Sequence, residues 1–213
     1  MNRKRITKKA TLALVAMMTV TSVVGCSQSN NSNKNQQGSN QKTEQKTEQK
    51  TDKNTNSSLS SSTIFKDMKT TDIDGNKVDK SIFSKYKLTM VNVWNTGCSP
   101  CISEIPTLDR LNKEYRDKGV SIKGMLLESG IGLTDEEKAT AKEILSKANA
   151  TYQQLTVTKD MVEKDDTLLL QAFPTTFFID KDGNIVDSIE GSNDYDGWKA
   201  KIDEVLKKVE ANE

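Results

Sequence analysis

The chain has 213 residues and a formal net charge of +1, and it contains no histidine. A charge this close to neutral argues against a nucleic-acid partner, which normally requires a clustered basic excess. The lack of histidine excludes histidine metal ligands, Cys–His nucleophiles and Ser–His–Asp triads, so we expect no metal and no cofactor of that kind.

Residues 1–25 have the composition of a secretory signal peptide. Residues 1–9 are basic with no acidic side chain, and an apolar run follows at residues 12–24. This run is too short to cross a bilayer comfortably as a permanent helix. Its end, Val23-Val24-Gly25-Cys26, resembles a bacterial lipobox, which implies that Cys26 carries a lipid on the outer face of the cell membrane. The alternative is an uncleaved N-terminal anchor, and in both cases the remaining chain is extracytoplasmic, where disulfides persist.

Residues 26–62 are predicted to form a lipidated, disordered tether. They are rich in Ser, Asn, Gln, Lys and Thr, and a Lys-Thr-Glu-Gln unit occurs twice, at residues 42–45 and 46–49. Such a segment has too few apolar side chains to offset the entropy of ordering. All aromatic residues lie from Phe65 onward, so residues 63–213 are predicted to be the single folded domain.

The folded segment alternates short apolar runs with helical periodicity. Asp74-Gly75-Asn76 marks the turn of a small hairpin, and Thr134 with Glu137 predicts a capping box. The expected elements are strand 87–94, helix 102–118, strand 120–127, helix 134–149, a short helix 165–172, strands 175–179 and 185–189, and helix 195–209. This order predicts an α/β fold: a mixed central sheet with helices on both faces, an N-terminal β-hairpin and an inserted helix.

The segment Cys98-Ser99-Pro100-Cys101 follows the first long strand directly and opens a helix. Once Cys26 is lipidated, these are the only two thiols, which is too few for a structural zinc site. Haem attachment needs a histidine after the second cysteine, and Ile102 stands there. A purely structural disulfide remains an alternative, although a loop this small restricts the unfolded chain little.

The position of the pair favours redox chemistry. A helix N-terminus stabilises a thiolate through its free N–H groups and dipole. Cys98 is therefore predicted to be the exposed nucleophile and Cys101, one turn into the helix, the buried resolving thiol. Pro100 suits the first turn, because its missing N–H would have no intrahelical partner there.

Two segments of the chain resemble the TlpA/ResA-like branch of thioredoxin-fold proteins. Residues 91–106 match its active-site segment, with Trp four residues before the first cysteine, Pro before the second, and Glu then Pro after it. Residues 173–180 look like its cis-proline strand. The resemblance covers about residues 64–212 and implies a thioredoxin fold with a redox-active Cys98–Cys101 disulfide.

The resemblance assigns further roles near the cysteines. Pro174, if cis, would lie against the pair, and the backbone of Phe173 would pair with an extended substrate segment. Trp94 would pack there and screen the disulfide. For Pro174 the alternative is an ordinary proline of an edge strand.

Glu104 lies three residues after Cys101, and in this branch that glutamate is linked to proton transfer at the buried cysteine. A partly buried carboxyl has a raised pKa and can accept a thiol proton near neutral pH. The alternative is a solvated glutamate on a helix surface. Asn92 stands where ordinary thioredoxins carry a buried aspartate. The proton-transfer route through that aspartate is therefore absent, which strengthens the assignment of proton transfer to Glu104.

The sequence therefore predicts a membrane-anchored thiol–disulfide oxidoreductase that is a monomer. Its leading role is reduction of disulfides in envelope proteins such as apocytochrome c or methionine sulfoxide reductase, with electrons from a membrane thiol donor of the CcdA/DsbD type. A thiol oxidase would use the same residues. A peroxidase is disfavoured because Val91 and Asn95 replace its Pro and Thr, and a non-enzymatic binding lipoprotein is disfavoured by the intact motif.

Overall fold

The computed structural model describes residues 61–129 and 132–212. The predicted signal peptide, the lipidation site Cys26 and the tether up to residue 60 lie outside the described residues. None of the helices within those ranges is both long and apolar enough to cross a bilayer.

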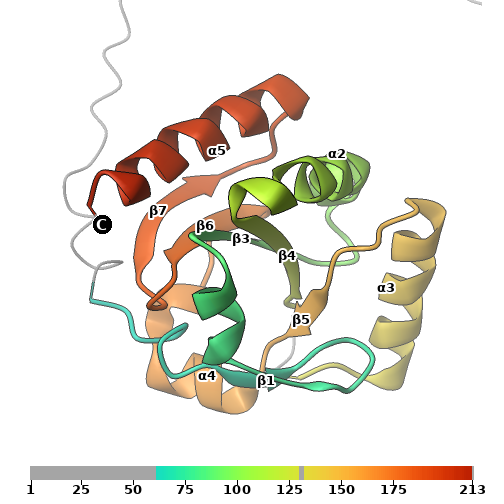
Figure 1. The fold of residues 1–213 in the computed structure, drawn as a ribbon. Coiled ribbons are helices and arrows are strands. Elements are labelled where there is room, and N and C mark those ends of the chain that lie inside the picture. The colour runs from blue at the N-terminus through green and yellow to red at the C-terminus, as the bar shows by residue number, and fades with distance from the viewer. Residues whose placement is uncertain (1–60, 130–131, 213) are drawn as a thin grey trace, which may run out of the picture. The chain divides into compact units, whose positions relative to one another are not determined.

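The described chain forms short strands and helices in alternation (Figure 1). The strands are β1 Lys69–Thr71, β2 Lys77–Asp79, β3 Leu88–Trp94, β4 Val120–Leu126, β5 Gln154–Thr156, β6 Thr175–Asp180 and β7 Ile185–Glu190. The α-helices are α2 Ser99–Tyr115, α3 Asp135–Lys147, α4 Lys159–Lys164 and α5 Tyr195–Glu210. Short 3₁₀ segments lie at Lys80–Lys85, Arg116–Lys118 and Asp166–Leu168.

The main sheet is mixed and has the strand order β5-β4-β3-β6-β7. The β3–β4 and β4–β5 pairs are parallel, whereas β3–β6 and β6–β7 are antiparallel. Every residue of the central strand β3 is buried, as expected for a strand covered on both faces. The predicted mixed sheet is confirmed, and β1 and β2 form the predicted hairpin beside it.

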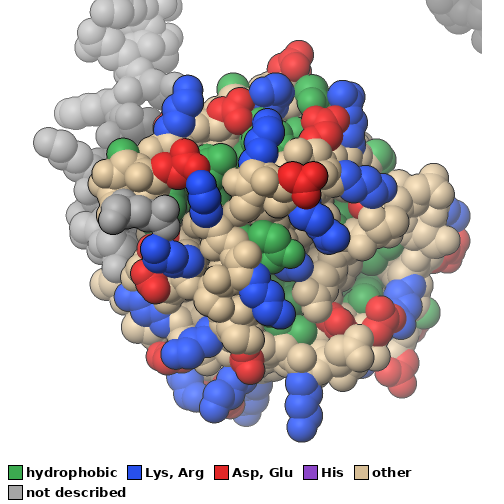
Figure 2. Space-filling view, in the orientation of Figure 1, with side chains coloured by type: hydrophobic (Ala, Val, Ile, Leu, Met, Phe, Trp, Pro, Cys, Tyr) green, Lys and Arg blue, Asp and Glu red, His purple; other side chains and the backbone are tan. Residues whose placement is uncertain are grey.

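The two faces of the sheet are covered differently. Helices α2 and α5 pack together on one face (Figure 1), where Leu108 and Trp198 belong to one core cluster. The other face is covered by the β1–β2 hairpin, the 3₁₀ segment Lys80–Lys85 and α4, with Phe65 and Phe83 in its core. On the face shown in Figure 2, acidic and basic side chains are interspersed.

The prediction of a short helix at residues 165–172 is wrong. Only Asp166–Leu168 forms a 3₁₀ turn: the Asp165 carboxylate caps its start by accepting from the Thr167 N–H at 2.9 Å, and the turn ends at Leu169, whose backbone (φ −79°, ψ 64°) is not helical. The same carboxylate accepts from the hydroxyl of Ser62 at 2.8 Å, so Ser62, the last residue assigned to the tether, is buried against the domain. Strand β5 and helix α4 were not predicted, because segments this short show no hydrophobic periodicity in the sequence.

The capping box predicted at the start of α3 is confirmed. Thr134 Oγ1 accepts from the Glu137 N–H at 3.2 Å, and Glu137 Oε2 accepts from the Thr134 N–H at 2.8 Å. We expect Thr134→Ala to lower the free energy of unfolding by about 1 kcal/mol in urea titrations. Thr140→Ala is the control: its hydroxyl bonds the Glu136 carbonyl within the helix, so its loss should be neutral or stabilising. Equal effects of the two changes would contradict the capping role.

Candidate redox site

The two cysteines form a disulfide at the junction of β3 and α2. Strand β3 ends at Trp94, Cys98 is the N-cap of α2, and Cys101 lies in the first turn. The Cα atoms of Cys98 and Cys101 are 5.3 Å apart across the bond. The helix begins at Ser99, three residues earlier than predicted, so the whole pair belongs to its N-terminus.

The two sulfurs differ in exposure. Cys98 is half-buried, whereas Cys101 is completely buried. The backbone N–H of Cys101 donates to Cys98 Sγ at 3.3 Å, and Pro100 in the first turn is exposed. On reduction, the same N–H and the helix dipole would stabilise a thiolate on Cys98.

The loop that leads into Cys98 is held by side chains. Asn95 Oδ1 accepts from the Gly97 N–H at 3.1 Å, and Glu128 Oε1 accepts from the Thr96 N–H at 2.8 Å. The sequence reading missed Glu128, because nothing in its local pattern shows that the end of β4 approaches this loop. Side-chain hydrogen bonds therefore fix the turn that connects β3 to Cys98.

The Phe173–Pro174 peptide bond is cis. Pro174 is buried, and its carbonyl accepts from the Gly191 N–H at 2.8 Å. It precedes β6, which lies between β3 and β7, so the alternative of an edge-strand proline is wrong. Phe173 is half-buried, packs against both core clusters and lies outside the strand ladder.

Glu104 is buried, with 3% of its surface exposed. Its Oε1 accepts from Asn92 Nδ2 at 2.8 Å, and its Oε2 accepts from Trp198 Nε1 at 2.9 Å and from the Asn193 N–H at 3.2 Å. Burial raises the pKa of the Glu104 carboxyl, and the hydrogen bonds from Trp198, Asn92 and Asn193 only partly offset it. The alternative of a solvated helix glutamate is therefore wrong. Trp198 and Asn193 were missed as site residues, since α5 was recognised only by its apolar face.

Trp94 is fully buried in the core cluster that contains Cys101. Its indole Nε1–H donates to Gln154 Oε1 at 3.0 Å. Gln154 belongs to the edge strand β5, and its side chain is buried. Gln154 lies opposite Gly124 in the β4–β5 ladder. A side chain at Gly124 would overlap the Gln154 carboxamide, so glycine is required there by close approach.

We therefore expect Gly124→Ala to destabilise the protein by about 1–3 kcal/mol. The added methyl group displaces Gln154 and leaves the buried Trp94 N–H without its acceptor. Urea titration followed by tryptophan fluorescence measures the effect. Gly97→Ala is the control, because its new Cβ would meet only Asn95 Oδ1 at an ordinary 3.5 Å. An unchanged midpoint for Gly124→Ala would contradict this packing.

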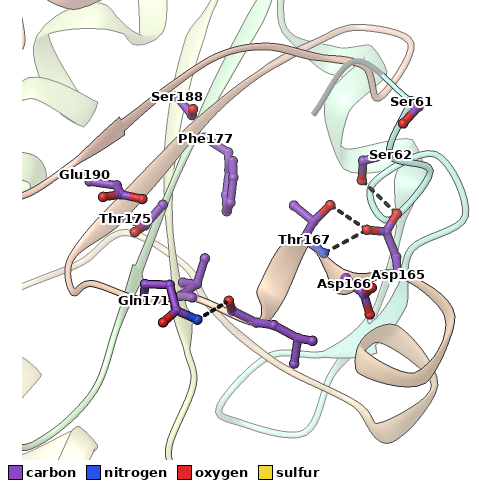
Figure 3. A pocket seen from close by; sticks show the side chains of 12 residues that line it. Ser61, Ser62, Asp165, Asp166, Thr167, Gln171, Thr175, Phe177, Ser188 and Glu190 are labelled. Carbon is purple, nitrogen blue, oxygen red and sulfur yellow. Dashed lines mark hydrogen bonds between the residues drawn. The ribbon is translucent and has the colours of Figure 1, made fainter. Parts of the chain in front are cut away.

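A cavity of about 430 Å³ lies beside the cis-proline segment (Figure 3). Gln171 and Thr175, which flank that segment, line it together with Phe177 and Glu190. Neither cysteine contributes to its wall, so this cavity is not where the disulfide reacts.

Comparisons with known proteins agree with this geometry. A family model described as Redoxin matches residues 59–206. Thiol-disulfide oxidoreductase ResA of Bacillus thuringiensis subsp. konkukian is 30% identical over 139 residues, covering 65% of this chain and 72% of ResA. The crystal structure of a thiol:disulfide interchange protein from Chlorobium tepidum TLS superposes with a TM-score of 0.53 at 23% identity, covering 65% of this chain and 92% of that one. The thioredoxin domain of a thiol-disulfide oxidoreductase from Bacteroides vulgatus gives a TM-score of 0.50 at 26% identity, covering 63% and 91%.

Proposed function

Because the chain belongs to the Redoxin family, in its ResA-like, thioredoxin-fold branch, and is a thiol–disulfide oxidoreductase, we propose that it reduces disulfides in extracytoplasmic proteins through Cys98 and Cys101. One observation carries the proposal. A half-buried N-cap cysteine is paired with a fully buried cysteine, whose own N–H points at the first sulfur. This asymmetry gives one sulfur that a client can reach and one that reacts only internally.

The proposed cycle starts from the reduced pair. The Cys98 thiolate attacks a client disulfide, forming a Cys98–client bond and releasing one client sulfur, which takes up a proton. Cys101 then loses its proton and attacks Cys98, forming the Cys98–Cys101 disulfide and releasing the second client thiolate, which is protonated in turn. Two electrons pass from the cysteine pair to the client disulfide. A membrane thiol donor of the CcdA/DsbD type would return the pair to the reduced state.

Glu104 is proposed to accept the proton that Cys101 loses. Cys101 is completely buried, so its thiol needs an internal acceptor rather than bulk water. Glu104 lies three residues further along α2, on a neighbouring face of the helix. Its raised pKa brings it closer to neutral pH, where a general base is most effective.

Clients are proposed to bind along the cis-proline segment. The backbone of Phe173 lies just before β6 and outside the ladder, so an extended client strand can add its hydrogen bonds there. Apocytochrome c and oxidised methionine sulfoxide reductase are the candidate clients.

The anchoring proposal rests on the N-terminal sequence. Cys26 would carry a lipid, and a flexible tether that begins at residue 27 and ends before Ser62, which is buried against the domain, would have a reach of about 35 Å. The domain would then act as a monomer near the outer face of the cell membrane, where a membrane thiol donor is accessible. Lipid labelling of the wild-type chain and of Cys26→Ala tests this step separately from the chemistry.

The direction of transfer is tested by the reduction potential. Equilibration of the mature chain with a dithiothreitol buffer should give a strongly reducing value, near the thioredoxin end of the range of about −270 to −120 mV. In parallel, Cys101→Ser should accumulate a mixed disulfide at Cys98 with a disulfide-containing client, because the resolving thiol is gone. A potential near −120 mV would instead make the protein an oxidase, and a failure to trap any client would overturn the exchange mechanism.

A further inference from the structure

The two carboxyl oxygens of Glu104 are not equivalent. Oε2 accepts two hydrogen bonds, from Trp198 Nε1 at 2.9 Å and from the Asn193 N–H at 3.2 Å. Oε1 accepts one, from Asn92 Nδ2 at 2.8 Å. A carboxylate oxygen that already faces two N–H donors has little room for a proton of its own. The free acceptor capacity of the group therefore lies on Oε1.

The donors are fixed by three separate parts of the fold. Trp198 is fully buried in α5, and Asn193 lies just before the Asp194 N-cap of that helix. Asn92 is buried in β3, and its Nδ2 also donates to Thr176 Oγ1 at 3.0 Å, which fixes the orientation of the amide. Glu104 cannot rotate without breaking a bond to each of these elements.

We propose that Trp198 is a positioning residue for the exchange reaction: its indole N–H, together with the Asn193 backbone, occupies Oε2 and directs the proton from Cys101 to Oε1 of Glu104. The proposal rests on the role of Glu104 in the proposed function. N–H donors stabilise the ionised carboxylate, so Trp198 also keeps Glu104 ready to accept a proton despite its burial.

Within residues 61–129 and 132–212, Glu104 forms no salt bridge, so its negative charge is stabilised by N–H donors, of which the Trp198 indole is one. On α5, Lys199 pairs with Asp203 and Lys201 with Asp187, and Asp194 caps the Gly197 N–H.

A further titratable neighbour is Tyr152, which lies in the loop between α3 and β5. Its buried hydroxyl has no hydrogen-bond partner in the described structure. Burial chiefly raises the pKa of this phenol, and the charges of Glu104 and Asp109 raise it further. The phenol therefore stays neutral when Glu104 titrates. The Asp109 carboxylate accepts hydrogen bonds from Lys113 and from the Thr151 N–H, which favour its ionised form. In the pH range in which Glu104 titrates, we therefore expect the charge to change on Glu104 alone among these three groups.

The chain offers a matched pair for the test, because it contains two tryptophans. Both are fully buried and both donate an indole hydrogen bond, Trp198 to Glu104 and Trp94 to Gln154. In the oxidised mature chain no thiol of the pair titrates, so the two indole ¹⁵N–¹H signals can be followed with pH by NMR. The Trp198 signal should move with the titration of Glu104 while the Trp94 signal stays in place. Glu104→Gln should remove the movement.

A variant then tests the consequence. Trp198→Phe should shift the Glu104 carboxyl titration, read by ¹³C NMR, to higher pH. It should also slow resolution of a Cys98 mixed disulfide by about tenfold at pH values below the midpoint, with recovery above it. Trp94→Phe removes the other indole and should leave the Glu104 midpoint unchanged. A purely structural role of Trp198 would lower stability without moving either profile.

Two outcomes would overturn the proposal. The first is that neither the Trp198 nor the Trp94 indole signal moves as Glu104 titrates. The second is that the Glu104 titration midpoint in Trp198→Phe equals that of the wild type. Its failure is distinguishable from failure of the proposed function. The NMR titration is made on the oxidised protein and needs no turnover. If the Trp198 signal followed Glu104 but the protein had no exchange activity, the hydrogen bond between them would be supported and the proposed function would be rejected.

Discussion

Replacing Cys98 with serine should abolish disulfide exchange, lowering the turnover of a protein disulfide by at least about 10³-fold. Cys98 is the only sulfur of the pair that is accessible, because Cys101 is completely buried. A serine hydroxyl at the N-cap can still accept the Cys101 N–H, so the helix start should be retained while the nucleophile is lost. Insulin reduction monitored by turbidity, with thermal unfolding as the check on folding, measures both effects.

Pro100→Ala is the matched control for this prediction. It changes an exposed residue between the cysteines without removing a sulfur, so exchange should continue. If Cys98→Ser retained turnover comparable with Pro100→Ala, Cys101 or another group would have to be the nucleophile, and the assignment of roles within the pair would fall.

Glu104→Gln should slow closure of the Cys98–Cys101 disulfide by about 10²-fold near pH 7. The amide cannot accept the Cys101 proton, so closure must wait for that buried thiol to ionise unaided. The wild-type rate should rise with pH through the titration of Glu104 and then level off, whereas the variant should rise only at more alkaline pH. Stopped-flow measurement of mixed-disulfide resolution gives both profiles, and superimposable profiles would show that Glu104 takes no part.

The same change should stabilise the folded protein at neutral pH. Burial raises the pKa of Glu104 in the folded state above its unfolded value, so the unfolded chain ionises first as pH increases. Wild-type stability therefore falls between the unfolded and the folded pKa, and Glu104→Gln escapes that loss. The glutamine can keep its contact with Asn92 if that amide turns over and the Thr176 hydroxyl, which now accepts from Asn92, donates to it instead.

Glu114 on the same helix gives the opposite sign. Hydrogen bonds from Tyr195 and Arg110 lower the pKa of its carboxyl in the folded state. The ionised carboxylate therefore stabilises the folded protein at pH values above the unfolded pKa, and this stabilisation is lost as the pH falls through the folded pKa. Glu114→Gln should therefore lower stability slightly at neutral pH. Urea titrations from pH 4 to pH 8 would distinguish the two carboxyls, and parallel behaviour of both variants would contradict the burial of Glu104.

Local patterns predicted the strand-to-helix junction that carries the two cysteines. The apolar run of β3 and the cysteines directly after it specify the strand-to-helix junction, and Pro100 fits its first turn. Thr134 and Glu137 mark the start of α3 because a capping box involves only neighbouring residues. Where the interactions are local, the sequence was sufficient.

The hydrogen bonds around Glu104 could not be predicted in this way. Trp198 is 94 positions from Glu104 along the chain and Asn193 is 89, and neither carries a local signal of that contact. In the sequence, Trp198 is indistinguishable from the other apolar residues on its face of the helix. Asn193 bonds Glu104 only through its backbone N–H, which any residue except proline could supply. Gln154 was missed for a related reason, because β5 has three residues, too few to show a pattern.

The dependence of Glu104 on α5 has a consequence for the order in which the chain becomes competent. Both cysteines are synthesised about 90 residues before residues 193–198. A nascent or proteolytically shortened chain that ends before Asn193 would contain the complete CxxC motif but would lack two of the three donors to Glu104. In the proposed mechanism, full reactivity would therefore arise only when residues 193–198 have been synthesised and folded.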